Sequence, residues 1–201
     1  MVGWQGDIRR ASSADARVVG TILAEAFMRD PVSGWIFPDE RHRAEAHPAF
    51  FGEFVTLALD AGEVHLAGDG AGATLWLPVD GGEGESDEGQ ELYRALEASI
   101  GAEATKRFAI LDELMTANHP GEPHWYLPFI AVHPDHHGRG VGSALLRHQL
   151  ARLDGLGSAA YLEASSPRNA ALYERHGFAQ REVTLDLPGG PSLYPMWRNP
   201  A

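Results

Sequence analysis

The sequence contains no cysteine, and this absence excludes several classes of site. Without thiolates the chain cannot form a disulfide, a thiolate zinc site, an iron–sulfur cluster or a cysteine acyl-enzyme. Lysine is nearly absent as well, because Lys106 is the only one in 201 residues. The Gly-Lys-Ser/Thr step of a P-loop nucleotide triphosphatase is therefore missing.

Positive charge and long apolar runs are also scarce. The chain carries 28 acidic against 16 basic residues, a net charge of −12, which argues against general nucleic-acid binding. No apolar run approaches the ~20 residues that a membrane helix needs, and residues 1–15 are too polar for a signal peptide. We expect a soluble cytoplasmic protein with one domain over residues 1–201, a length sufficient for a substantial core.

Hydrophobic periodicity predicts alternating helices and strands. The predicted helices cover residues 14–29, 40–60, 91–115 with a break near Gly101, 140–153 and 169–176. The predicted strands cover 7–10, 63–67, 73–77, 126–132 and 159–164, with a C-terminal hairpin over 178–187 and 192–198. The acidic, glycine-rich segment 80–90 is interpreted as a mobile surface loop, with a substrate-facing lid as the alternative.

A glycine loop between an apolar strand and a helix is the most informative segment. Gly138, Gly140 and Gly142 alternate at the start of the helix that follows the strand ending at Val132. Small residues let the backbone approach a ligand closely, and the free N–H groups of a helix N-terminus favour phosphate or pyrophosphate. The pattern predicts a phosphate-binding loop.

Two competing interpretations of this loop fit less well. A dinucleotide-binding G-x-G-x-x-G pattern would need glycine where Leu145 stands. A metal cluster of His133, His136 and His137 would have only Asp135 as a nearby acidic ligand, in the same turn. We therefore expect no metal site.

Two motifs in this order resemble those of the GNAT acetyltransferase superfamily. The run His137-Gly-Arg-Gly140-Val-Gly142 is similar to its pyrophosphate loop, Gln/Arg-x-x-Gly-x-Gly/Ala, with histidine at the first position. The run from Asn169 through Tyr173 to Gly177-Phe178 is similar to the segment that follows the family's fifth strand. Within the superfamily the chain most resembles the puromycin N-acetyltransferase branch, through segments such as 122–127 and 133–136.

The resemblance implies an α+β GNAT fold, with a mixed, mostly antiparallel sheet of six or seven strands flanked by helices. It implies acetyl-CoA as co-substrate and a small-molecule amine as acceptor; a homodimer is left open. The expected acetyl-CoA contacts are the strand Ile130-Ala131-Val132, the loop residues Gly138, Arg139, Gly140, Val141, Gly142 and Ser143, and Asn169. The alternatives are a protein N-terminal or lysine acetyltransferase and a non-catalytic CoA-binding sensor.

Two residues are candidates for proton transfer. Tyr173 would donate a proton to the departing thiolate, because an unperturbed phenol stays protonated at neutral pH; the alternative is a core tyrosine beside Phe178. Glu163 stands in an otherwise apolar strand, where a carboxylate needs a reason, and family members carry a base on this strand. A structural hydrogen bond is the alternative for Glu163, and His124 and His133 are weaker candidates for the base.

The acceptor pocket is expected to involve aromatic side chains from the N-terminal half and from the start of the 126–132 strand. Such rings can enclose an aromatic or cationic substrate, although core packing is the ordinary role of each one. The candidates are Phe27, Trp35, Trp125 and Tyr126.

Overall fold

The computed structural model describes residues 4–81 and 87–201. Its strands are Ile8–Arg10 (β1), Glu63–Ala67 (β2), Gly72–Val79 (β3), His124–Val132 (β4), Ala160–Ala164 (β5), Ala179–Gln180 (β6), Leu185–Asp186 (β7) and Ser192–Arg198 (β8). Its α-helices are Ala16–Ala26 (α1), Pro31–Ile36 (α2), Glu40–Ala61 (α3), Asp87–Ile100 (α4), Ala102–Thr116 (α5), Val141–Leu156 (α6) and Pro167–Glu174 (α7). Short 3₁₀ turns cover 13–15, 27–29 and 134–136.

The described strands form one mixed sheet in the order β1-β2-β3-β4-β5-β8-β6, with β7 also paired to β8. Every pairing is antiparallel except that of β4 with β5, which run parallel. The expected mixed, mostly antiparallel sheet flanked by helices is confirmed, with eight strands rather than six or seven.

The eighth strand arises because the first arm of the C-terminal hairpin is interrupted between β6 and β7. Arg181 N donates to the Pro195 carbonyl, but Pro195 has no N–H to return the bond. A proline therefore ends the ladder at that point of the strand pair. The hairpin predicted as one long arm becomes two short strands, β6 and β7.

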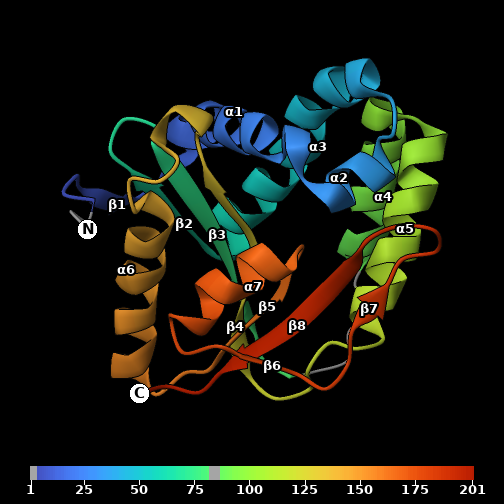
Figure 1. Ribbon diagram of the computed structural model, residues 1–201. Coiled ribbons are helices and arrows are strands. Elements are labelled where there is room, and N and C mark those ends of the chain that lie inside the picture. The colour runs from blue at the N-terminus through green and yellow to red at the C-terminus, as the bar shows by residue number, and fades with distance from the viewer. Residues whose placement is uncertain (1–3, 82–86) are drawn as a thin grey trace.

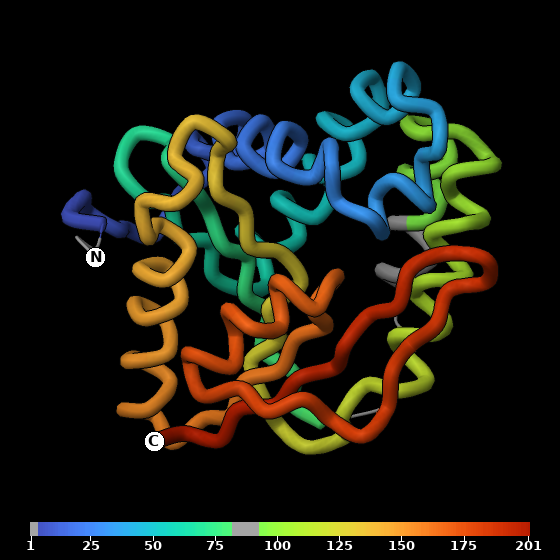
Figure 2. The backbone as a smooth tube through the Cα atoms, viewed as in Figure 1, coloured from blue at the N-terminus to red at the C-terminus, as the bar shows by residue number. Residues whose placement is uncertain are grey.

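Helices cover both faces of the sheet (Figure 1). One core packs α1, α3, α4 and α5 against β2 and β3, and the other packs α6 and α7 against β4, β5 and β8. Alternation along β3 sends Leu75 to the first core and Trp76 to the second, as the two-residue period of a strand requires. Figure 2 shows the segment after β5 crossing in front of the sheet before the chain returns through β8.

The acidic segment 80–90 was predicted as a loop, and its end is helical. Helix α4 begins at Asp87, because acidic residues that suggest a loop are equally favourable in the first turn of a helix. Residues 82–86 lie outside the described part of the chain. Across the described ranges, every helix is too short or too polar to cross a membrane.

Candidate active site

A cleft with a volume of about 990 Å³ opens where β4 and β5 separate. The two strands pair only at Trp125↔Ala160 and Tyr126↔Tyr161, whereas the other edge of β4 stays paired with β3 as far as Val132. The edge of β4 beyond Tyr126 therefore has no partner among the residues of β5. That open edge forms a wall of the cleft.

The glycine loop also lines this cleft. Gly138 and Gly140 have φ angles of +75° and +78°, a backbone conformation that residues with a side chain rarely adopt. Gly140 is the N-cap of α6, and the first helical hydrogen bond runs from Ala144 N–H to the Gly140 carbonyl. The N–H groups of residues 141–143 consequently have no helical acceptor and are available to an anion.

Two histidines fasten the loop to the rest of the molecule. His133 Nε2 lies 2.7 Å from Glu25 Oε2 on α1. His137, which stands where the family motif has Gln or Arg, pairs through Nε2 with the Val132 carbonyl at 3.0 Å, a bond in which the ring nitrogen donates. The side chain of His137 therefore ties the loop to the end of β4.

Helix α7 brings two of the predicted residues to the cleft. Ser166 caps the helix by accepting from Asn169 N, and Pro167 occupies the first turn. Asn169 Nδ2 donates to Ser165 Oγ at 3.1 Å, and Ser165 Oγ donates to Asp30 Oδ2 at 2.6 Å. This chain of bonds joins α7 to the start of α2, since Asp30 also caps that helix.

Tyr173 lies one turn further along α7, lines the cleft and is 7% exposed. Its ring packs edge-on against Phe178, with 6.0 Å between centroids. Burial raises the pKa of this phenol well above 10, and the negative charge of Asp30 makes a smaller contribution in the same direction. The phenol consequently stays protonated across the physiological range.

Glu163 lines the cleft from β5 with a side chain that is only 3% exposed. Burial raises the pKa of Glu163 to about 7, and interactions with the phenols of Tyr126 and Tyr161 offset part of that rise. Among the described residues, Glu163 Oε1 accepts no hydrogen bond, and His119 Nδ1 lies 3.9 Å from it. A buried carboxyl with such a pKa can exchange a proton near neutral pH.

Six phenylalanines line the cleft, and we call them the phenylalanine cluster. Neighbouring rings have centroids 5.1 to 5.7 Å apart, mostly edge to face. The cluster comprises Phe27, Phe50, Phe51, Phe54, Phe108 and Phe129. The cluster provides a wide apolar wall of the cleft, which Tyr126 also lines.

The structure brings most of the predicted site residues to one cleft. Those that line it are Phe27, Tyr126, Ile130, Ala131, Val132, Gly138, Gly140, Val141, Gly142, Ser143, Glu163, Asn169 and Tyr173. Arg139, Trp35 and Trp125 are not among its lining residues.

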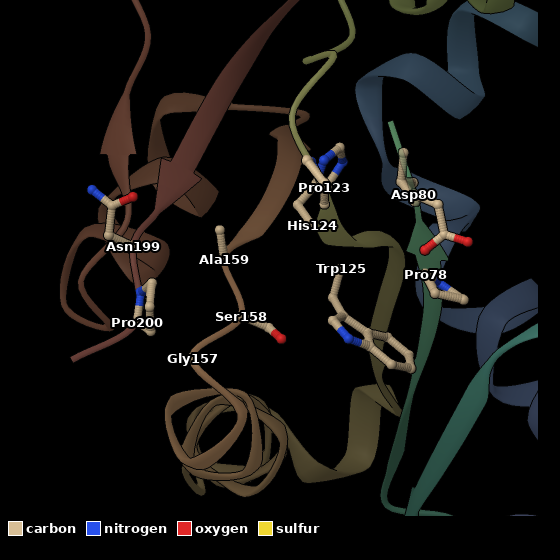
Figure 3. Close-up of a pocket in the computed structure, with 11 residues that line it drawn as sticks. Pro78, Asp80, Pro123, His124, Trp125, Gly157, Ser158, Ala159, Asn199 and Pro200 are labelled. Carbon is tan, nitrogen blue, oxygen red and sulfur yellow. The ribbon is translucent and has the colours of Figure 1, made fainter. Parts of the chain in front are cut away.

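The two tryptophans occupy other parts of the molecule. Trp35 Nε1 donates to the Pro188 carbonyl, and the Arg107 guanidinium lies 5.5 Å from its ring, so Trp35 holds the turn between β7 and β8. Trp125 stacks under Arg152 at 5.3 Å and lines a separate cavity of about 410 Å³ (Figure 3). Both rings therefore have structural partners outside the cleft.

Comparison with known proteins identifies the family. A model of the acetyltransferase (GNAT) domain matches residues 104–180. The crystal structure described as histone acetyltransferase HPA2 and related acetyltransferase, from Corynebacterium glutamicum, is 30% identical, with 98% of each chain covered and a TM-score of 0.70. The chain belongs to the GNAT acetyltransferases. It is an N-acetyltransferase, an enzyme that uses acetyl-CoA.

More distant GNAT structures share the fold. A polyamine N-acetyltransferase from Drosophila melanogaster, which forms N-acetylagmatine, is 17% identical with a TM-score of 0.64, and 96% of this chain and 99% of that one are covered. Arylalkylamine N-acetyltransferase 2 from Aedes aegypti is 14% identical with a TM-score of 0.65, and the coverage is 98% and 100%.

Sequence reasoning missed several cleft residues of this GNAT acetyltransferase. Asp30 precedes a proline and so could be predicted as a helix cap, but its bond to Ser165, 135 residues away, had no sequence signal. Five members of the phenylalanine cluster were also missed as site residues, because a buried Phe in a helix or strand is typical of any core. In the described part of the chain, no group of three or more His, Asp or Glu residues is placed to hold a metal ion.

Proposed function

We propose that this GNAT enzyme acetylates the primary amine of a small molecule with an apolar or aromatic body, as one catalytic domain spanning residues 1–201. The observation that carries the proposal is the composition of a single cleft. The glycine-loop backbone, the open edge of β4, the phenylalanine cluster and the buried Glu163 all line it. Donor and acceptor could meet there directly, and without cysteine no thioester acyl-enzyme can form.

The residues present fit acetyl-CoA as the donor. Its pyrophosphate would be held by the backbone N–H groups of Gly138–Ser143, with Arg139 beside them, at the N-terminus of α6. Its amide-bearing arm would run along Ile130, Ala131 and Val132 as an added strand, because that edge lacks a β5 partner. Asn169, oriented through Ser165 by Asp30, would contact the same arm from α7.

The chain's own groups supply the proton transfers of the reaction. Glu163 takes a proton from the amine nitrogen as that nitrogen attacks the thioester carbonyl, and the carboxylate becomes a carboxylic acid. Backbone N–H groups of residues 130–132 stabilise the oxyanion. When the carbon–sulfur bond breaks, Tyr173 donates its proton to the thiolate, whose parent thiol has a pKa of about 8.5.

The phenylalanine cluster favours an acceptor with a flat or apolar body. The rings pack edge to face against one another and present a continuous apolar surface to the cleft. A substrate would bury its own apolar surface against these rings. Tyr126 belongs to this pocket, together with Phe27. Arylalkylamines, after which one of the similar enzymes is named, combine an amine with such a body. The aminonucleoside puromycin, suggested by the sequence resemblance, does so as well.

A panel of acceptors, followed by release of free CoA, tests the proposal. We expect kcat/KM to be highest for small aromatic primary amines, puromycin included, lower for agmatine, and lowest for peptides with a free N-terminus or lysine. Faster turnover of peptides would point to a protein acetyltransferase. Tight acetyl-CoA binding with no turnover of any amine would point to a CoA-binding sensor.

A further inference from the structure

A pair of histidines lies between the cleft and the second cavity. Glu163 lines the cleft, and His124 lines the smaller cavity, where Figure 3 shows it beside Pro123 and Trp125. His119 stands between them, with Nε2 3.1 Å from His124 Nε2 and Nδ1 3.9 Å from Glu163 Oε1. His119 is not among the residues that the sequence predicted to act in catalysis.

The hydrogen bonds of the pair fix both tautomers. His124 Nδ1 lies 2.7 Å from the carbonyl oxygen of Glu122, so this nitrogen must carry the proton and donate. In a neutral imidazole the other nitrogen, Nε2, then holds a lone pair. His119 Nε2 must donate to it, which leaves the lone pair of His119 on Nδ1, the atom that faces Glu163.

The surroundings keep both rings neutral and in place. Burial lowers the pKa of His119 to about 4 and also lowers the pKa of His124, and the charge of Arg181 acts in the same direction on both. The ring of His119 packs edge-on against Tyr126 and Tyr161, each at 4.9 Å, and His124 packs against Tyr161 and Trp197. Neither imidazole can turn over without disturbing these contacts.

A lone pair opposite Glu163 distinguishes the two forms of that carboxyl. The carboxylate has only lone pairs to offer and gains nothing from His119 Nδ1. The carboxylic acid carries an O–H that can donate to Nδ1, once the two atoms approach by about 1 Å to hydrogen-bond distance. The arrangement therefore stabilises the form of Glu163 that exists after it has taken a proton.

We infer that His124 holds His119 in the tautomer that receives the O–H of Glu163, so that the pair favours the protonated state of the catalytic base. The inference rests on the proposed role of Glu163. In the step concerned, the N–H bond of the amine breaks, the O–H bond of Glu163 forms, and that O–H donates to His119 Nδ1. His119 and His124 are positioning residues, because they act through Glu163.

Other charged or titratable groups act on this carboxyl or on the rings around it, and they must stay constant in any test. Tyr126 on β4 and Tyr161 on β5 interact with Glu163, and both phenols have pKa values raised by burial and by its charge. Arg181, after β6, acts on Tyr161 and on both histidines. Asp112 on α5 acts on Tyr126. The variants below leave these four residues unchanged.

The first test reads the tautomers of the ligand-free protein by nitrogen-15 NMR of labelled histidines. We expect His119 to be protonated at Nε2 and bare at Nδ1, and His124 to show the reverse, with H119Q and H124Q spectra supplying the assignments. A wild-type protein with a proton on Nδ1 of His119 would overturn the inference. This measurement requires neither a substrate nor turnover.

The second test compares H124L with H124Q. The side-chain amide oxygen introduced by H124Q can accept from His119 Nε2 and keep the tautomer, whereas the aliphatic side chain introduced by H124L offers no acceptor. In H124L, His119 is free to protonate Nδ1 and donate to the carboxylate. We expect the infrared titration of Glu163, isolated by subtracting the E163Q spectrum, to move about one pH unit lower in H124L and to stay near wild type in H124Q.

The acid limb of the pH profile of kcat/KM should likewise move to lower pH in H124L and stay near the wild-type position in H124Q. Identical titration of Glu163 in wild type, H124L and H124Q would overturn the inference. If Glu163 titrates as expected in all three proteins while E163Q retains full turnover, the assignment of Glu163 as base fails and the inference about its protonation stands.

Discussion

A carboxyl group that acts as a base must be ionised, but burial away from water makes its ionisation less favourable. At the scale of one residue this conflict is concentrated in Glu163, whose side chain is 3% exposed and whose pKa is raised by burial to about 7. A base with a pKa near the working pH combines a useful ionised fraction with a useful driving force. The same burial must therefore reduce the stability of the folded protein at neutral pH.

Replacing Glu163 by Gln tests this conflict. The folded protein holds the proton up to about pH 7, whereas the unfolded chain releases it near 4.5, so folding stability falls as pH rises between those values. At about 1.4 kcal/mol per pKa unit, the cost above pH 7 is about 3 kcal/mol. We expect E163Q to unfold at higher denaturant than wild type at pH 8, to match it near pH 4.5, and to lose turnover.

The exposed Glu182 supplies the control, because E182Q removes a charge without removing a buried one. It should leave both the stability and the turnover unchanged. Equal stability of E163Q and wild type at pH 8 would show that Glu163 is not held as a costly buried anion.

Tyr173 is the second residue with a chemical role to test. The change to Phe keeps the ring, its contact with Phe178 and its place in the cleft, and removes only the hydroxyl. We expect kcat to fall roughly 10²- to 10⁴-fold, the range of general acid catalysis, while the Kd for acetyl-CoA and the melting temperature change little. Y194F, in a tyrosine of β8 outside the cleft lining, should retain kcat; equal kcat in Y173F and Y194F would make Tyr173 a packing residue.

At the scale of elements, the strand–loop–helix unit from β4 to α6 shows what a local pattern can predict. The alternating glycines and the apolar run before them were sufficient for the loop, because both positive φ angles and the helix start are short-range features. By contrast, the opening between β4 and β5, which pair at only two positions, is a property of two strands that the sequence separates by helix α6. The break between β6 and β7 likewise depends on Pro195, which lies in a different strand.

The glycine loop predicts a specific dependence of stability on acetyl-CoA. At about 100 times its Kd, a ligand that binds only the folded state stabilises it by about 2.7 kcal/mol. Gly140 has a φ of +78°, so G140V strains the loop and places a branched side chain on the surface that would face the pyrophosphate. We expect calorimetry to show the full stabilisation in wild type and little or none in G140V.

Gly155, in the same helix, offers a matched control, because a Cβ there meets nothing within 4 Å. G155A should raise the stability of the free protein by about 0.5–1 kcal/mol and keep the response to acetyl-CoA. Equal responses of G140V and G155A would remove the glycine loop from the donor site.

At the scale of the whole molecule, the site is assembled from segments that the sequence keeps far apart. The 3₁₀ turn after α1 brings Phe27, and helices α3 and α5 bring four more members of the phenylalanine cluster. The C-terminal half brings the glycine loop, Glu163 and Tyr173. The bond from Ser165 to Asp30 links the two halves across 135 residues. Local patterns predicted the elements, but not which aromatic side chains would face the cleft, so Trp35 and Trp125 were expected there and five phenylalanines were not.

The net charge of −12 is likewise a property of the whole chain, and it predicts how acceptors approach. A negative protein attracts cationic amines before contact, and salt screens this attraction, because the Debye length falls from about 30 Å at 0.01 M to about 8 Å at 0.15 M. We expect kcat/KM for a cationic aromatic amine to fall several-fold between these salt concentrations. A matched acceptor bearing a distal carboxylate, and so no net charge, should change far less. Since steering acts on encounter, kcat at saturation should stay constant for both acceptors. Equal salt dependence of the two acceptors would mean that the local field of the cleft, and not the charge of the whole molecule, governs their approach.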